Sequence, residues 1–124
     1  VDAGARAHAP AAPPAYFDLV LSAETIYSTA ALDALWGALR VLLRPGSGHA
    51  LVAAKSYYFG VGGGVAQLVE RVRADVGPDG LARFEAERVA TVEDGVSTRR
   101  EVLCIRALEG AASLMTTASS RREE

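Results

Sequence analysis

Two short segments hold the residues whose types and spacing could do chemistry. The first, residues 22–27 (SAETIY), directly follows an apolar run at 17–21. Glu24 and Tyr27 stand three residues apart in it, so a single turn of chain can aim both side chains into one pocket. A carboxylate there could orient or deprotonate a nitrogen nucleophile. In the competing structural interpretation, Glu24 is solvated on a loop and Tyr27 packs at its rim.

The second segment, residues 55–64 (KSYYFGVGGG), follows the apolar run at 49–54. Gly60, Gly62 and Gly64 spell G-x-G-x-G, a pattern that favours a phosphate or nucleotide cradle. The segment has neither the G-x-G-x-x-G spacing nor the G-K-[ST] of a Walker loop. The same residues therefore also fit an aromatic, glycine-rich loop that closes over a substrate, or a plain mobile loop.

The other reactive side chains give weaker signals. Cys104, the single cysteine, alternates with apolar neighbours in a run that indicates a core strand. The histidines, His8 and His49, lack the spacing of metal ligands, and we expect no metal site. Arg99 and Arg100 stand beside a turn, where we expect them at the surface. No Ser-His-Asp set can be assembled from these residues.

The apolar patterns predict the elements that must position the two segments. Residues 17–21 and 49–54 are short apolar runs typical of buried parallel strands. Between them, apolar residues recur at helical spacing over 32–43, and Ser28 or Thr29 can cap that helix.

A second helix and a hairpin follow. Apolar residues over 65–76 have helical spacing, and Gly-Pro-Asp-Gly at 77–80 ends that helix. Residues 84–92 and 98–108 are predicted strands around Glu-Asp-Gly at 93–95, a hairpin signal. This order predicts an α/β fold with a parallel sheet that is covered by helices and ends in an antiparallel hairpin. The strands are too few for a complete doubly wound sheet, so we expect half of one.

Composition limits the class of protein. The chain has 124 residues, a net charge of −2 and 50% hydrophobic residues, which favours one folded domain and no specific nucleic-acid partner. No stretch reaches the roughly 18 apolar residues of a membrane span, so we expect no membrane partner. We divide the chain into a flexible Ala/Pro-rich linker or insertion at 1–15, a domain at 16–108 and a disordered polar tail at 109–124. The first residue is Val, and we take the chain as a fragment or processed product.

Together the two segments resemble the protein-histidine N-methyltransferase family. The matching blocks are 17–27 (FDLVLSAETIY) and 53–65 (AAKSYYFGVGGGV), in that order, with a helix of suitable length between them. The resemblance extends from about residue 16 to residue 108. The family belongs to the seven-strand, S-adenosylmethionine-dependent methyltransferases. The resemblance therefore implies strands four to seven of a class I, Rossmann-like sheet, with the last two as the hairpin.

The resemblance also implies roles for individual residues. Ser22 and Ala23 would lie beside the methionine part of S-adenosylmethionine, the implied cofactor. Glu24 and Tyr27 would be the catalytic residues that line the acceptor site, and Glu24 would fix or deprotonate the imidazole. The loop would shape the pocket around the target histidine, through substrate-binding residues that lie between positions 55 and 64: Lys55, Tyr58, Phe59, Gly60, Gly62, Gly63 and Gly64.

The implied function is methyl transfer to a histidine side chain of a ribosomal or translation-linked protein. The enzyme would be cytoplasmic and nuclear, and a monomer at full length. The chain lacks the family's glycine-rich turn and acidic ribose ligand, so alone we expect it neither to bind the cofactor nor to methylate. Its open sheet edge should make it prone to association. The alternatives are a protein-lysine methyltransferase of the same fold, a non-catalytic truncated binding module, and a nucleotide-binding α/β domain.

Overall fold

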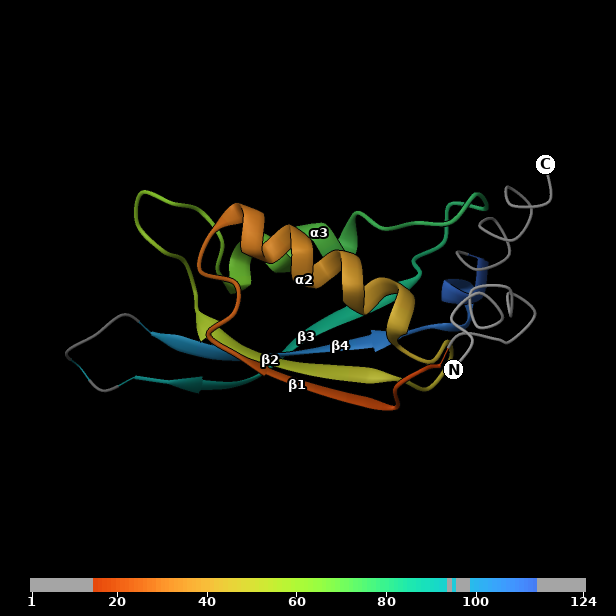
Figure 1. Ribbon diagram of the computed structural model, residues 1–124, viewed down its shortest axis with the longest axis horizontal. Helices are drawn as coiled ribbons and strands as arrows, with labels where there is room; N and C mark the ends of the chain where they lie inside the picture. The colour runs from red at the N-terminus through yellow and green to blue at the C-terminus, as the bar shows by residue number, and fades with distance from the viewer. Residues whose placement is uncertain (1–14, 94, 96–98, 114–124) are drawn as a thin grey trace, which may run out of the picture.

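The computed structural model describes residues 15–93, 95 and 99–113, and the structure below is that of these residues. Its four strands form one sheet, and helices α2 and α3 lie on one of the two faces of that sheet (Figure 1). The α/β class predicted from the sequence is therefore confirmed. The elements are, in chain order, β1 (Leu19–Ala23), α2 (Thr29–Leu42), β2 (His49–Lys55), α3 (Val65–Arg73), β3 (Phe84–Val92), β4 (Arg100–Ala107) and the 3-10 helix η1 (Glu109–Ala111).

The strands are arranged in the order β1-β2-β4-β3. β1 and β2 run parallel, with Leu19 opposite His49, as a strand–helix–strand unit predicts. β4 is antiparallel to both of its neighbours, so the predicted hairpin of β3 and β4 is confirmed. Because β4 lies between β2 and β3, its first residue, Arg100, is opposite Lys55 at the carboxyl end of β2.

Helix α2 begins where the sequence predicts. Ser28 is its N-cap, and the Ser28 hydroxyl oxygen accepts a hydrogen bond of 3.1 Å from the backbone nitrogen of Ala31. The face of α2 that packs on the sheet buries Trp36, whose ring meets that of Phe84 edge-on with 4.9 Å between the centroids. This contact ties α2 to the start of β3 across the core.

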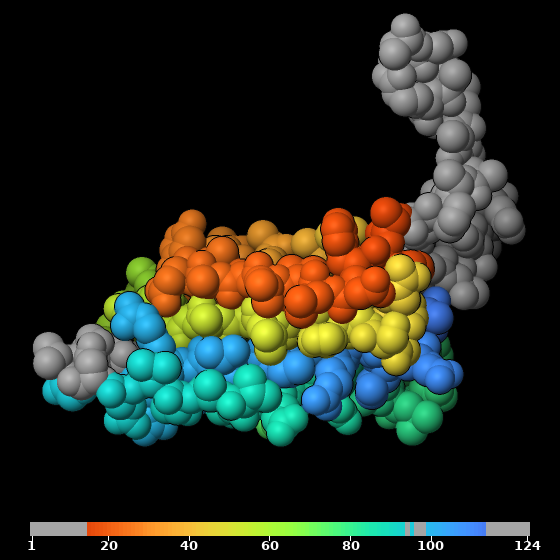
Figure 2. Space-filling model, turned by 90° about the horizontal axis from the view of Figure 1, so that it is seen from below, coloured from red at the N-terminus to blue at the C-terminus, as the bar shows by residue number. Residues whose placement is uncertain are grey.

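The predicted burial of the strand at 17–21 is wrong. β1 begins at Leu19 and is an edge strand, with Leu19 and Leu21 pointing away from the helices; Leu21 is 68% exposed. An apolar run is typical of a strand covered on both faces, but α2 and α3 cover only one. Figure 2 shows the other face, on which β1, β2, β4 and β3 follow one another as bands without a helix over them.

The second helix is shorter than its apolar pattern predicts. α3 ends at Arg73, and Val76 lies outside it with its side chain exposed, so the assignment of Val76 to the helix is wrong. The chain leaves the helix where Asp75 turns inward to pair with Arg40 of α2 at 2.7 Å and with Arg83 at 3.4 Å. This paired, buried carboxylate fixes the end of α3.

The boundaries also differ from those expected. η1 follows β4 directly and buries Ala111, so the packed part of the chain continues past Leu108 into the expected tail. The predictions for residues 1–14, for the rest of the tail at 114–124 and for Asp94 in the hairpin turn concern residues outside those described. Among the described residues, no helix is both long enough and apolar enough to span a bilayer.

Candidate functional site

The two segments singled out in the sequence meet at the carboxyl edge of the sheet. β1 and β2 are parallel, so the loops that leave their ends start side by side. The loops are joined by backbone hydrogen bonds: the Gly64 nitrogen donates to the Ile26 oxygen at 2.8 Å, and the Thr29 nitrogen donates to the Val61 oxygen at 3.4 Å. The edge of the sheet thus carries one composite surface made by residues from both segments.

Glu24 lies at the centre of this surface with an unusual backbone. Its φ is +57°, in the left-handed region that side chains other than glycine adopt uncommonly. Its nitrogen donates to the Ala53 oxygen at 2.8 Å, which continues the β1–β2 pairing past the end of β1. Residues held in such conformations by their surroundings cluster at functional sites.

Both oxygens of the Glu24 carboxylate have a donor. The Tyr58 hydroxyl donates to Oε1 at 3.2 Å, and Arg100 Nε donates to Oε2 at 3.2 Å. Three parts of the chain, namely the end of β1, the loop after β2 and the start of β4, therefore converge on one carboxylate. The carboxylate is 47% exposed, so a ligand can still reach it.

Tyr58 is fixed as a hydrogen-bond donor. Its oxygen accepts a 3.3 Å hydrogen bond from the Lys55 backbone nitrogen, and Lys55 Nζ lies 5.5 Å from the ring centroid. Burial raises the pKa of the Tyr58 phenol above its ordinary 10.0, the Lys55 hydrogen bond opposes this, and the nearby Glu24 charge adds to the rise. The phenol is therefore neutral at physiological pH, keeps its proton and donates a hydrogen bond to Glu24.

Arg100 is a member of the site that the sequence did not reveal. It is partly exposed, as expected of a surface residue, but its guanidinium is ion-paired with Glu24, from which it is separated by 76 positions in the sequence. The pairing depends on β4 lying next to β2. Only the strand order could have shown it, and the hairpin signal alone does not give that order.

The glycines of the second segment serve close packing of the two loops. A Cβ on Gly63 would run into the Ile26 carbonyl and lie 2.7 Å from the Ser28 nitrogen. A Cβ on Gly64 would lie 2.5 Å from the Ser56 oxygen. Both residues also have positive φ, so glycine is required at each for two reasons.

This packing argues against a phosphate cradle. The Gly64 nitrogen is bonded to the Ile26 oxygen, and the Gly63 nitrogen donates to the side-chain oxygen of Gln67. A cradle needs such N–H groups free to point at the anion. Gly60, by contrast, has open space around it and forms only a turn, with φ +78°.

The remaining predicted residues lie around this centre. Tyr27 is exposed and follows the fully buried Ile26. Phe59 is 80% exposed, and its ring packs edge-on against that of Tyr57 with 4.9 Å between the centroids. The Ser22 hydroxyl is hydrogen-bonded to that of Thr25. An open hollow on the uncovered side of the sheet is lined by Leu21, Ser22, Ala23, Leu51, Ala53 and Val102.

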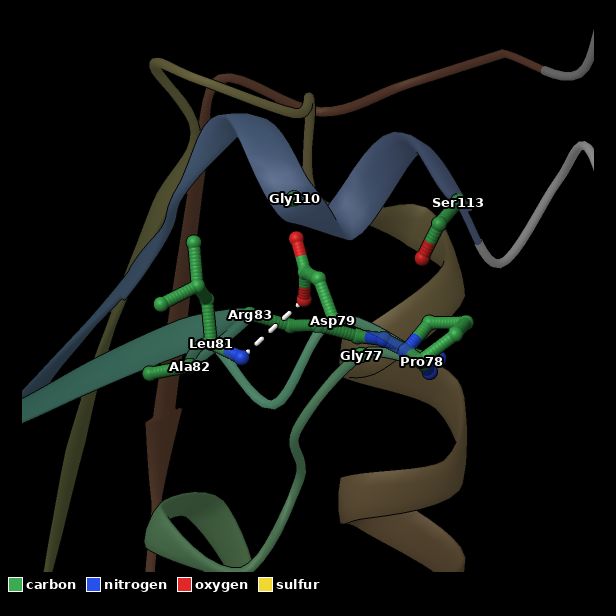
Figure 3. A pocket seen from close by; sticks show the side chains of 8 residues that line it. All are labelled: Gly77, Pro78, Asp79, Leu81, Ala82, Arg83, Gly110 and Ser113. Carbon is green, nitrogen blue, oxygen red and sulfur yellow. Dashed lines mark hydrogen bonds between the residues drawn. The ribbon is translucent and has the colours of Figure 1, made fainter.

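A second cavity lies at the opposite, amino edge of the sheet (Figure 3). Its volume of about 190 Å³ is below the roughly 300 Å³ at which pockets for drug-sized ligands begin. The loop before β3 forms one wall, where Asp79 Oδ1 accepts a 3.0 Å hydrogen bond from the Leu81 nitrogen, and Gly110 of η1 faces it. Within the described ranges, no group of three or more His, Cys, Asp or Glu side chains could hold a metal ion.

Sequence comparison defines the class of protein, and the relatives found are all methyltransferases by name. The chain is 32% identical over 87 residues to the histidine protein methyltransferase 1 homolog of Dictyostelium discoideum, a match of 70% of this chain and 26% of that protein. It is 47% identical over 58 residues to histidine protein methyltransferase 1 of Schizosaccharomyces pombe, 47% of this chain and 16% of that protein. The homolog from Mus musculus is 37% identical over 81 residues, 64% of this chain and 20% of that protein. No family model matches the sequence.

The chain belongs to the histidine protein methyltransferase family, as the resemblance of its two segments predicts. It spans about a quarter or less of the length of these relatives.

Proposed function

We propose that the described part of the chain forms the acceptor side of an S-adenosylmethionine-dependent protein-histidine N-methyltransferase. One observation carries the proposal: at the carboxyl edge of β1 and β2, Glu24 is held between Tyr58 and Arg100 while nearly half of its side chain stays exposed. Ligands of open α/β sheets bind at this edge. The names of the relatives support the reaction, since each is a histidine protein methyltransferase.

Glu24 orients the acceptor imidazole in this proposal. The cofactor supplies a methyl group on a positively charged sulfur, and the protein must hold a neutral ring nitrogen in line with it. Glu24 accepts a hydrogen bond from the other ring nitrogen, which fixes the tautomer, and it is placed to take the proton that the ring releases. Carboxylate oxygens have two lone pairs each, so Tyr58 and Arg100 leave Glu24 free to accept one more bond.

The aromatic side chains hold the ring and the protein that bears it. Tyr58 lies against Glu24 and, with the exposed Tyr27, offers flat surfaces that bracket an imidazole. The exposed pair of Tyr57 and Phe59 contacts the acceptor protein beyond the target residue. We propose that this acceptor is a ribosomal or translation-linked protein, and that the full-length enzyme is a monomer in the cytoplasm and the nucleus.

The described residues fit one part of the cofactor. The hollow beside Ser22 and Ala23 is mostly apolar with one hydroxyl, which suits the CH₂ groups of the methionine part but not its ammonium and carboxylate groups. No glycine-rich turn follows β1, where 22–28 reads SAETIYS, so the remaining contacts must come from elsewhere. We therefore propose that β1, β2, β3 and β4 are strands four to seven of a seven-strand sheet. We expect calorimetric titration of the 124-residue chain with S-adenosylmethionine to give no saturable binding.

Product analysis tests the proposed reaction. The full-length protein would be incubated with methyl-labelled cofactor and a ribosomal protein extract, and the labelled proteins digested for mass spectrometry. We expect the label on histidine, its loss in Glu24→Gln, and its retention in Glu85→Gln, which changes an exposed β3 carboxylate paired with Arg106. Label on lysine would favour the lysine methyltransferase of the same fold, and no label at all would favour the non-catalytic binding module.

A further inference from the structure

We infer that Glu101 is a positioning residue that holds the root of the substrate loop, here defined as residues 55–64. Glu101 is the second residue of β4 and is 6% exposed, so that it is a buried carboxylate directly beside Arg100. The expected kinetic effects rest on the proposed function. The expected effect on the position of the loop does not depend on the reaction.

The two oxygens of the Glu101 carboxylate hold one partner each. The Ser56 hydroxyl donates to Oε1 at 3.0 Å, and Arg88 Nε of β3 lies 3.0 Å from Oε2. Burying a carboxylate is costly unless it is paired and hydrogen-bonded, and these contacts meet both conditions. β4 therefore joins its neighbour β3 to the first residue after β2 through one side chain.

Ser56 in turn fixes both ends of the substrate loop. Its backbone nitrogen donates to the Arg99 carbonyl oxygen at 3.2 Å. Its backbone carbonyl oxygen accepts a 3.1 Å hydrogen bond from the backbone nitrogen of Ala66, in the first turn of α3. The same oxygen faces Gly64, where a Cβ would clash with it. The start and the end of the loop thus meet at Ser56, and Glu101 holds the Ser56 side chain.

Stability alone does not account for this arrangement. Replacing a buried ion pair by an apolar side chain of similar volume is often neutral or stabilising, because desolvation offsets the attraction. Arg88 is 41% exposed and can turn to water if Glu101 is absent. The Glu101 carboxylate instead fixes the position of Ser56. Tyr58 lies two residues after Ser56 and donates to Glu24, so the position of Tyr58 depends on the same contact.

Hydrogen exchange in the full-length protein tests this role. In Glu101→Met and in Ser56→Ala, we expect the amides of Gly64 and Ala66 to exchange about ten- to a hundredfold faster, as the loss of a charge-assisted hydrogen bond implies. The double variant should exchange no faster than either single variant, because both remove the same contact. Glu101→Gln keeps an acceptor for Ser56 and should restore most of the protection. Glu85→Met, which removes an exposed, ion-paired carboxylate from β3, is the matched control.

Kinetics provide a second readout. We expect Glu101→Met to raise KM for the protein substrate about tenfold and to leave KM for S-adenosylmethionine unchanged. Additive effects in the double variant would overturn the inference. Unchanged exchange in Ser56→Ala would overturn it as well, and that variant remains informative even if Glu101→Met fails to fold. Faster exchange in a protein that methylates nothing would leave the inference standing and refute the proposed function.

Discussion

Glu24 and Asp75 are carboxylates at opposite ends of the strands, and each has two hydrogen-bond donors. Glu24 follows the carboxyl end of β1, and Asp75 lies in the loop that leads to the amino end of β3. Asp75 pairs with Arg40 and Arg83 and has a side chain that is 7% exposed. Glu24 pairs with Arg100 and Tyr58, stays far more open to solvent, and sits on left-handed backbone. The two sites use similar chemistry in different surroundings, and the surroundings separate a structural role from a functional one.

Burial decides what each carboxylate can do. Asp75 links α2, the end of α3 and the approach to β3, and its surroundings leave little of it open to a ligand. Exposed ion pairs such as that of Glu24 contribute little to stability, so the strained backbone at Glu24 is not accounted for by stability. Asp75 and its two arginines therefore maintain the fold, whereas Glu24 is suited to act on a ligand that binds at the carboxyl edge.

The largest expected effect separates the two carboxylates by stability. Asp75→Ala leaves the mostly buried Arg83 without its partner and should lower the free energy of unfolding by about 3–5 kcal/mol. Glu24→Ala should lower it by less than about 1 kcal/mol. Urea denaturation measures both, with the exposed ion-pair variant Asp33→Ala as control. Equal losses for Asp75→Ala and Glu24→Ala would remove the distinction.

A smaller effect is expected where the glycines join the two loops. Gly63→Ala forces a side chain into left-handed backbone and into the Ile26 carbonyl, and should destabilise the protein by at least about 2 kcal/mol. Gly60 also has a positive φ, but a Cβ there would meet no neighbouring atoms. Gly60→Ala should therefore lower the free energy of unfolding by about 1 kcal/mol. The difference in urea midpoint isolates the packing contribution. If the two variants have the same midpoint, the close packing does not matter.

Tyr58→Phe sharpens the role of the carboxyl edge. Removing the hydroxyl takes one donor from Glu24 and should lower kcat of the full-length enzyme about tenfold, with little change in stability. Tyr16→Phe changes a tyrosine that packs against Arg44, outside both segments, and serves as the control. A kcat of Tyr58→Phe equal to that of the wild type would show that Tyr58 does not support Glu24.

The smallest effect concerns pH. The pKa of Tyr58 is raised on folding, so its neutral form is favoured in the native state and its contribution to stability is complete below about pH 10. That contribution is lost as the pH rises through the raised native value. Denaturant titrations between about pH 9 and pH 11.5 should show a steeper loss for the wild type than for Tyr58→Phe. Parallel curves would contradict a raised pKa.

The elements with local signals were predictable from the sequence. Ser28 caps α2 as its side-chain chemistry requires, and the Asp-Gly between apolar runs indicated the hairpin of β3 and β4. The family resemblance implied that the two segments share one site, and their meeting is accounted for by β1 and β2 being parallel and ending at the same edge. These features depend on neighbours in the chain or on rules that hold for any sheet.

The rest depends on tertiary contacts that no local pattern encodes. Arg100 and Glu101 belong to the carboxyl edge only because β4 lies between β2 and β3. The exposure of Leu21 depends on which faces the helices cover, and an apolar run is the same whether one face or two are covered. The glycines signalled unusual backbone angles, but the carbonyls they pack against come from the other segment.

The insertion of β4 also sets the order in which the site can be completed during synthesis. Residues 22–27 and 55–64 leave the ribosome well before Arg100 and Glu101. Among the described strands, β3 pairs only with β4, which is synthesised after it. A nascent chain that stopped at residue 98 would contain both segments that resemble the family, and Tyr58 with them. It would still lack Arg100, the second partner of Glu24, and Glu101, the partner of the Ser56 hydroxyl. Completion of the acceptor edge therefore coincides with the docking of β4, through contacts of long sequence separation that form late.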